Sequence, residues 1–306
     1  MGVRTALPIA LGLLVAGCGG ADEPGKGSER PPPPGSLAAL LARPGADVAW
    51  TPGTSDYAPG RTRVAFLVIR GDGRTVERPR ARVWLARDLG ARPFARAEAR
   101  LEAVGVPGAP SDPSEVANVY VVHLTFPAAG KYFLVAEPVG ATRPVQAVGD
   151  LVVREQTKAP AVGSRAIASR TPTIRSTNGD FARLTTRTPP DRELLRHSVA
   201  ESISARKPFV LAFATPKFCR SRTCGPVVDV LEAVRRRFVR SDIRFIHVEV
   251  YEDNNPSAGV NRWVKEWRLP TEPFVFLVGR DGLIKERFEG SVSVRELSAA
   301  VRRTLG

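Results

Sequence analysis

The sequence predicts two domains of different class: an all-β sandwich in the first half of the chain and an α/β domain in the last third. Residues 47–155 contain segments in which apolar and polar residues alternate between Gly and Pro turns, as expected for strands with one buried face. The last third alternates continuous apolar runs with amphipathic stretches, which indicates strands and helices of one sheet. A chain of 306 residues is also longer than most single domains.

Residues 1–18 have the features of an export signal. Its apolar stretch, residues 6–16, is shorter than the roughly 20 residues that a spanning helix needs. The end of the segment, Val15-Ala16-Gly17-Cys18, resembles the lipobox of bacterial lipoproteins. That resemblance implies cleavage before Cys18, acylation of its thiol, and a lipid-anchored protein on the extracytoplasmic face of the cell membrane. The alternative is an ordinary cleaved signal in which this cysteine is incidental.

Residues 19–46 are rich in Gly, Pro, Ser and charge, which predicts a flexible tether. The domain that follows is expected to contain five strands, at 62–70, 81–86, 118–126, 130–138 and 146–154. Short strands between Gly and Pro turns favour a sandwich, and the stretch resembles bacterial immunoglobulin-like modules in this pattern. His123 is expected to be a solvent-facing strand residue.

Residues 156–192 lack large apolar residues and are predicted to be a linker. The domain at 193–306 follows, with an entering helix over 191–207. Its expected elements are then a strand at 208–215, a helix at 225–238, a strand at 242–251, a helix at 257–267, two strands within 272–290 and a helix at 293–305.

Two cysteines, Cys219 and Cys224, remain after Cys18 is assigned to the anchor. Disulfides form and persist outside the cytoplasm, so this pair is expected to be a dithiol or a disulfide. The residues alone leave three uses open: thiol–disulfide exchange, a structural disulfide, and binding of Cu(I). A structural disulfide across so short a loop would contribute only about 2 kcal/mol on the entropic model.

The C-terminal third resembles the thioredoxin family. Cys224-Gly225-Pro226 matches the first three residues of that family's active-site motif, although Val227 stands where the second cysteine is usual. Pro273 matches the family's cis-proline, and Glu272 precedes it. The resemblance implies a thioredoxin-like fold and an oxidoreductase that acts on thiols and disulfides of envelope proteins, with Glu272 and Pro273 facing the substrate. It implies no cofactor and no metal.

A sulfur at a helix N-terminus is favoured as thiolate, and the expected helix places Cys224 there. Cys219 lies upstream, between Lys217 and Arg220, where access is expected to be greater. We therefore expect Cys219 to attack and Cys224 to resolve, with the reverse order as the alternative. The competing functions are a binding module braced by a structural disulfide and a Sco-like copper chaperone. The copper function needs a third ligand, for which His247, expected within a strand, is the only candidate in this domain.

Charge and motifs exclude other function classes. The formal charge of +14 is carried mostly by scattered Arg residues without interleaved aromatic residues, which argues against nucleic acid and favours attraction to an anionic membrane face. The sequence contains no Gly-rich phosphate loop, no Gly-x-Ser-x-Gly elbow and no paired His motif. Glu249, Glu252 and Asp253 are expected in a solvated loop.

Overall fold

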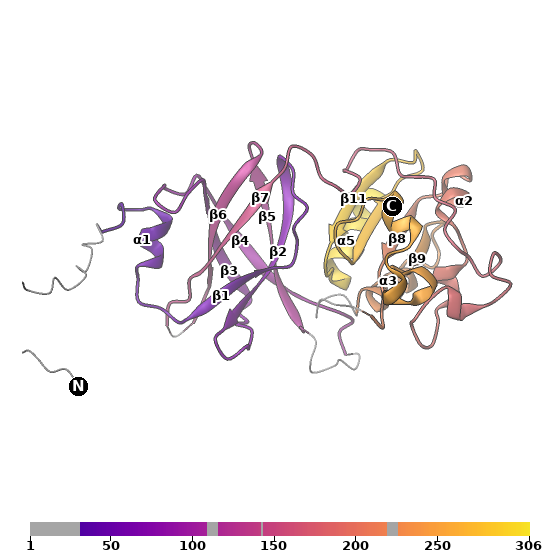
Figure 1. Ribbon diagram of the computed structural model, residues 1–306, viewed down its shortest axis with the longest axis horizontal. Coiled ribbons are helices and arrows are strands. Elements are labelled where there is room, and N and C mark those ends of the chain that lie inside the picture. The colour runs from indigo at the N-terminus through magenta and orange to yellow at the C-terminus, as the bar shows by residue number, and fades with distance from the viewer. Residues whose placement is uncertain (1–30, 109–115, 142, 219–225) are drawn as a thin grey trace, which may run out of the picture. The chain divides into compact units, whose positions relative to one another are not determined.

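A computed structural model describes residues 31–108, 116–141, 143–218 and 226–306 (Figure 1). Residues 32–306 form one compact unit. Cys18, Cys219 and Cys224 lie outside the described residues. In the part of the chain that the structure describes, no helix has the length and apolar character needed to cross a bilayer.

The first half of the described chain forms one antiparallel sheet with the strand order β1-β2-β5-β4-β3-β6-β7. Its apolar side encloses a core that includes Phe66, Tyr120, Phe126 and Tyr132. Figure 1 shows these strands wrapping around a common interior. The seven strands of this sheet, counted over the described residues, are β1 (Val48–Pro52), β2 (Gly60–Arg70), β3 (Arg80–Ala86), β4 (Ala95–Ala103), β5 (Asn118–Phe126), β6 (Gly130–Pro138) and β7 (Ala147–Val153).

The predicted immunoglobulin-like sandwich is therefore wrong. The five predicted strands exist, but they belong to a single sheet that curls until its two edges approach each other. Near that approach the Trp50 ring lies so close to Gly149 that an added Cβ would be 2.2 Å from it, and Tyr57 bridges to Val153. An alternating pattern specifies which side of a strand is buried, and both a sandwich and a curled sheet satisfy it.

The central strand β4 was missed because its sequence, ARAEARLEA, is rich in Ala and charge. These residue types are depleted in strands, so propensity argues against the strand that the structure contains. In the sheet β4 pairs with both β3 and β5 and joins the two halves into one surface. Ala99 is fully buried in the core, where a small residue fits the interior of a strongly curled sheet.

The predicted tether also contains structure. Residues Leu37–Leu41 form the short helix α1, whose N-cap Ser36 accepts a hydrogen bond from the Ala39 N–H. Leu37 is fully buried and packs against Ala86 and Val135 on the outside of the curled sheet. This packing holds the end of the expected tether against the sheet.

The second half contains a four-stranded sheet with the order β11-β10-β8-β9, of which only β8 and β9 run parallel. Helices α3 and α5 contact each other and cover one face. The elements of this half, in the described residues, are the 3-10 helices η1 (Phe181–Arg183) and η2 (Arg192–Leu195), α2 (Val199–Ser204), β8 (Phe209–Phe213), α3 (Val227–Arg237), β9 (Arg244–Val248), η3 (Glu252–Asn254), η4 (Pro256–Ala258), α4 (Arg262–Glu266), β10 (Phe274–Val278), β11 (Ile284–Glu289) and α5 (Val294–Thr304).

The predicted thioredoxin-like α/β fold is also wrong. The protein is mostly β, with a seven-stranded antiparallel sheet and a mixed four-stranded sheet in its described residues. Two predicted helices are reduced to fragments: α2 has six residues and α4 has five. The other face of the four-stranded sheet is covered by these fragments and by the connector, which contributes Ala159, Ala166 and Ile167 to the core.

The two predicted helices are shorter than expected for a common reason: a residue that caps a helix N-terminus lies within the apolar pattern from which each longer helix was predicted. Ser198 accepts from the Glu201 N–H in a capping box, so α2 begins there and not at residue 191. In the next segment Val260 bridges to Tyr251 and Asn261 caps α4. Apolar spacing indicates which side is buried, but local hydrogen bonds by Ser and Asn decide where the helix begins.

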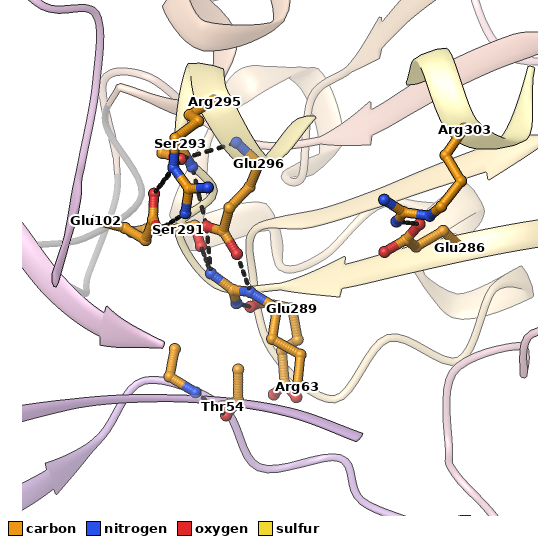
Figure 2. Close-up of polar contacts among 11 residues, drawn as sticks. Thr54, Arg63, Glu102, Glu286, Glu289, Ser291, Ser293, Arg295, Glu296 and Arg303 are labelled. Carbon is orange, nitrogen blue, oxygen red and sulfur yellow. Dashed lines mark hydrogen bonds and ion pairs between the residues drawn. The ribbon is translucent and has the colours of Figure 1, made fainter. Parts of the chain in front are cut away.

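The two sheets are joined by ion pairs and hydrogen bonds (Figure 2). Arg63 on β2 donates from Nε to Glu296 Oε1 over 2.9 Å and from Nη2 to the Ser291 carbonyl over 2.8 Å. The Arg63 and Glu296 side chains are only 8% and 10% exposed. Glu102 on β4 accepts from Arg295 and from Ser293 Oγ. Burial makes such contacts expensive to break, because each lost partner leaves a desolvated charge.

Candidate functional site

The structure describes both flanks of the cysteine pair. Strand β8 is buried along its whole length, and the chain continues through Thr215 to Phe218, the last described residue before Cys219. Description resumes at Pro226, the N-cap residue of α3, two positions after Cys224. The site is therefore built from the elements that hold these two ends.

Helix α3 begins where the sequence predicts a helix, and apolar residues on one side hold it on the sheet. Val227, Val228 and Leu231 are at most 1% exposed. The N-cap Pro226 makes no side-chain hydrogen bond to the first turn. The N-terminus of α3 is the positive end of the helix dipole, and it favours negative charge on groups close to that end.

A chain of contacts links the residue before Cys219 to the predicted substrate-facing loop. The Phe218 ring meets the Tyr251 ring edge-on, with 6.4 Å between centroids. The Tyr251 hydroxyl donates to Glu272 Oε1 over 3.3 Å. Glu272 is joined to Pro273 by a cis peptide bond, the isomer that the resemblance implied. Because Phe274 at the start of β10 lies opposite Phe213 at the end of β8, Glu272 and Pro273 lie at the same end of the sheet as the segment that leads to the cysteine pair.

The connector supplies a second wall of the site. Thr186 donates from N and Oγ1 to Glu249 Oε1, over 2.6 and 2.8 Å, and its Oγ1 accepts from the Lys217 N–H over 3.1 Å. Arg187 donates to Asp229 on α3 over 2.8 Å. These bonds fix the connector between the end of β9 and the start of α3.

A cavity of about 380 Å³ lies between the connector and this segment, lined among others by Phe181, Thr186, Lys217 and Phe218. The Lys217 ammonium lies 5.5 Å from the centroid of the Phe218 ring, close enough for a cation–π contact. The cavity combines two aromatic side chains with an exposed cation.

Sequence reasoning missed Thr186 and Arg187 because both lie in a Pro- and Thr-rich stretch without periodicity. No sequence signal identifies them, since their roles depend on Glu249 and Asp229, which lie 63 and 42 positions away. Glu249 was expected in a solvated loop, and this is wrong: it is only 5% exposed. Its neighbours Glu252 and Asp253 are exposed as expected.

The histidines lie where the strand pattern placed them. His247 is 3% exposed within β9, and its Nε2 lies 3.0 Å from the Ala214 carbonyl oxygen, so the backbone occupies that ring nitrogen. His123 is exposed on β5. Among the residues that the structure describes, no three His, Cys, Asp or Glu side chains are grouped so as to hold a metal ion.

Comparison with known protein families finds no family model that matches the chain, and comparison with curated proteins finds no match.

Proposed function

We propose that the protein is a thiol–disulfide oxidoreductase that acts on protein thiols and disulfides through Cys219 and Cys224. The observation that carries the proposal is the contact chain Phe218–Tyr251–Glu272, which joins the residue before Cys219 to the loop expected to face a substrate. The neighbouring 380 Å³ cavity offers room for the polypeptide that carries the target sulfur.

The exchange needs no cofactor. In the reduced protein a thiolate attacks one sulfur of a substrate disulfide, an S–S bond forms between protein and substrate, and the other substrate sulfur leaves as a thiolate that takes a proton from solvent. The second cysteine, as thiolate, then attacks the first and displaces the reduced substrate. The protein is then left with a Cys219–Cys224 disulfide, the two electrons lost by its dithiol are held by the two substrate thiols, and the same steps run in reverse.

The charges near the pair support exchange chemistry. The N-terminal end of α3 and the exposed Lys217 both favour a thiolate in the segment between them. Glu272 carries the opposite charge and acts against them. The reduction potential of the pair is the sharpest single measurement. Values between roughly −120 and −270 mV support exchange, while a value well below about −300 mV identifies a structural disulfide and overturns the proposal.

Trapping of substrates tests the two sulfurs separately. Because a resolving cysteine releases the substrate, Cys224→Ser is expected to accumulate mixed disulfides with envelope proteins, and Cys219→Ser is expected to accumulate few. The adducts are read on non-reducing gels after acid quenching, and the variant that lacks both cysteines is the control. Trapping by Cys219→Ser alone reverses the two roles. Trapping by neither single variant contradicts exchange and favours a binding module braced by a disulfide.

We also propose that the protein works on the extracytoplasmic face of the membrane, held by a lipid on Cys18. Cys18→Ser removes the sulfur that would carry the lipid, so the variant is expected to lose acylation and to stay unprocessed or be released. Labelling with a fatty-acid analogue and detergent phase partitioning measure both properties. A variant that is still processed and partitions like the parent rules out the lipobox.

A further inference from the structure

We propose that the outer side of β3 and β4 carries a binding site for a phosphate group. The site is a cavity of about 540 Å³ whose lining includes Arg78, Arg80, Arg100 and Arg295. A neighbouring cavity of about 290 Å³ shares Glu98, Arg100 and Arg295 with it. Phe218 and Pro226, the described residues on either side of the cysteine pair, are not among the lining residues of either cavity, and the inference does not rest on the proposed function.

Two of these arginines face each other across the strands. In the β3–β4 ladder Arg80 lies directly opposite Arg100, and both side chains are exposed. Like charges in this position destabilise an antiparallel pair, by up to about 1 kcal/mol. The next pair along the same side, Arg82 and Glu98, has opposite charges. The Arg80–Arg100 pair is thus unfavourable in the protein alone and becomes favourable when an anion lies between the two guanidinium groups.

The guanidinium groups retain donors for such an anion. The Arg100 guanidinium has no hydrogen-bond or ion-pair partner among the described residues, although its backbone pairs with the neighbouring strands. Arg78 donates from Nη1 to the Glu77 carbonyl, but its buried Nε has no acceptor among the described residues. Arg80 reaches Glu98 only at 3.6 Å, in an exposed pair.

The fourth arginine closes the end of the cavity. Arg295 pairs with Glu102, as Figure 2 shows, yet its side chain remains 59% exposed. Besides the four arginines, the cavity lining contains two carboxylates, those of Glu77 and Glu98. Glu77 is already engaged by Thr75 Oγ1 and Asn118 Nδ2, both neutral donors. Because Glu102 neutralises Arg295 and the lining itself holds two glutamates, the four arginines leave an excess of one positive charge at the cavity.

This arrangement selects the ligand by charge and shape. Arginine binds phosphate oxygens with two parallel N–H donors, and several guanidinium groups from different directions match a tetrahedral dianion better than a planar carboxylate. A phosphate group reaches the site either as a free anion or as part of a lipid headgroup at the membrane surface. Both sources present unesterified phosphate oxygens to Arg80 and Arg100, two of them with one negative charge in a phosphodiester headgroup and more of both in inorganic phosphate.

The test uses the full chain at low ionic strength with inorganic phosphate as the probe, measured by calorimetry and by the shift of the thermal midpoint. Arg80→Ala and Arg100→Ala are each expected to weaken phosphate binding about tenfold or more, because each removes charge-assisted hydrogen bonds. The matched control is Arg96→Ala, which lies on β4 but outside the cavity lining and is expected to change the affinity less than twofold. In the absence of anion, Arg100→Ala is expected to leave the midpoint unchanged or to raise it.

A second arm distinguishes the two sources by replacing phosphate with a short-chain phosphatidylglycerol below its micelle-forming concentration. Tighter binding of this lipid than of phosphate, lost in Arg100→Ala, supports the site and assigns it to a headgroup. Tighter binding of phosphate, lost in the same variant, supports the site and assigns it to a free anion. The proposal is overturned if neither probe shifts the midpoint of the parent protein, or if Arg96→Ala weakens binding as much as Arg100→Ala does.

Discussion

Replacing Asp56 with alanine is expected to lower the free energy of unfolding by about 3–5 kcal/mol, the usual effect of removing one partner of a buried ion pair. The Asp56 side chain is fully buried. Its Oδ1 accepts from the Lys158 N–H over 2.8 Å, and its Oδ2 accepts from the Ala159 N–H and from Arg287 Nη1, each over 3.0 Å. Alanine leaves the Lys158 N–H, the buried Ala159 N–H and one guanidinium without this acceptor.

The size of that effect follows from the position of Asp56. It precedes β2, Lys158 and Ala159 begin the connector, and Arg287 lies on β11, so one carboxylate joins three segments. The matched control is Asp150→Ala. Asp150 pairs with Lys131 over 3.2 Å, but both side chains are about half exposed. Its loss is expected to change the stability by less than about 1 kcal/mol.

Urea unfolding followed by fluorescence and circular dichroism measures both variants, with the slope against denaturant compared to confirm that the transition stays cooperative. Equal losses in Asp56→Ala and Asp150→Ala contradict the structural role of the buried pair. A separate early transition in Asp56→Ala alone is also informative, because it shows that the carboxylate couples the two sheets in a single unfolding unit.

Gly290→Ala is expected to destabilise the protein by about 3 kcal/mol, through left-handed backbone strain and overpacking together. Gly290 follows β11 with φ at +72°, and an added Cβ would lie 2.3 Å from the Gly53 carbonyl oxygen. That oxygen belongs to the backbone, so a side-chain rotation cannot relieve the contact. The end of β11 and the segment after β1 have to move apart.

Gly282→Ala separates strain from crowding. Gly282 has nearly the same φ, +74°, but its added Cβ would meet only Ile203 Cγ2, at 4.0 Å. The strain remains without the clash, and the expected loss is about 1 kcal/mol. Thermal and urea unfolding of the two variants provide the comparison. If Gly282→Ala lowers the free energy of unfolding as much as Gly290→Ala does, the close approach of Gly290 to the Gly53 carbonyl contributes nothing to the loss of stability.

Sequence reasoning identified part of the candidate site. The resemblance selected Pro273, and with it Glu272, and the structure links Glu272 to Phe218 through Tyr251. Sequence reasoning could not identify Thr186. A threonine in a Pro-rich connector has no periodicity or motif, and its role exists only because Glu249 lies buried beside it.

The sequence by itself determined the five predicted strands of the first half, where α3 and α5 lie, and that the two cysteines of the C-terminal third are close in the chain. These properties depend on local spacing, because the period of apolar residues differs between strands and helices. Only the tertiary structure decided how the strands combine. The Ala-rich strand β4 completes a curled sheet because β3 and β5 supply its hydrogen-bond partners, and pairing between distant segments leaves no signal in the local pattern of either one.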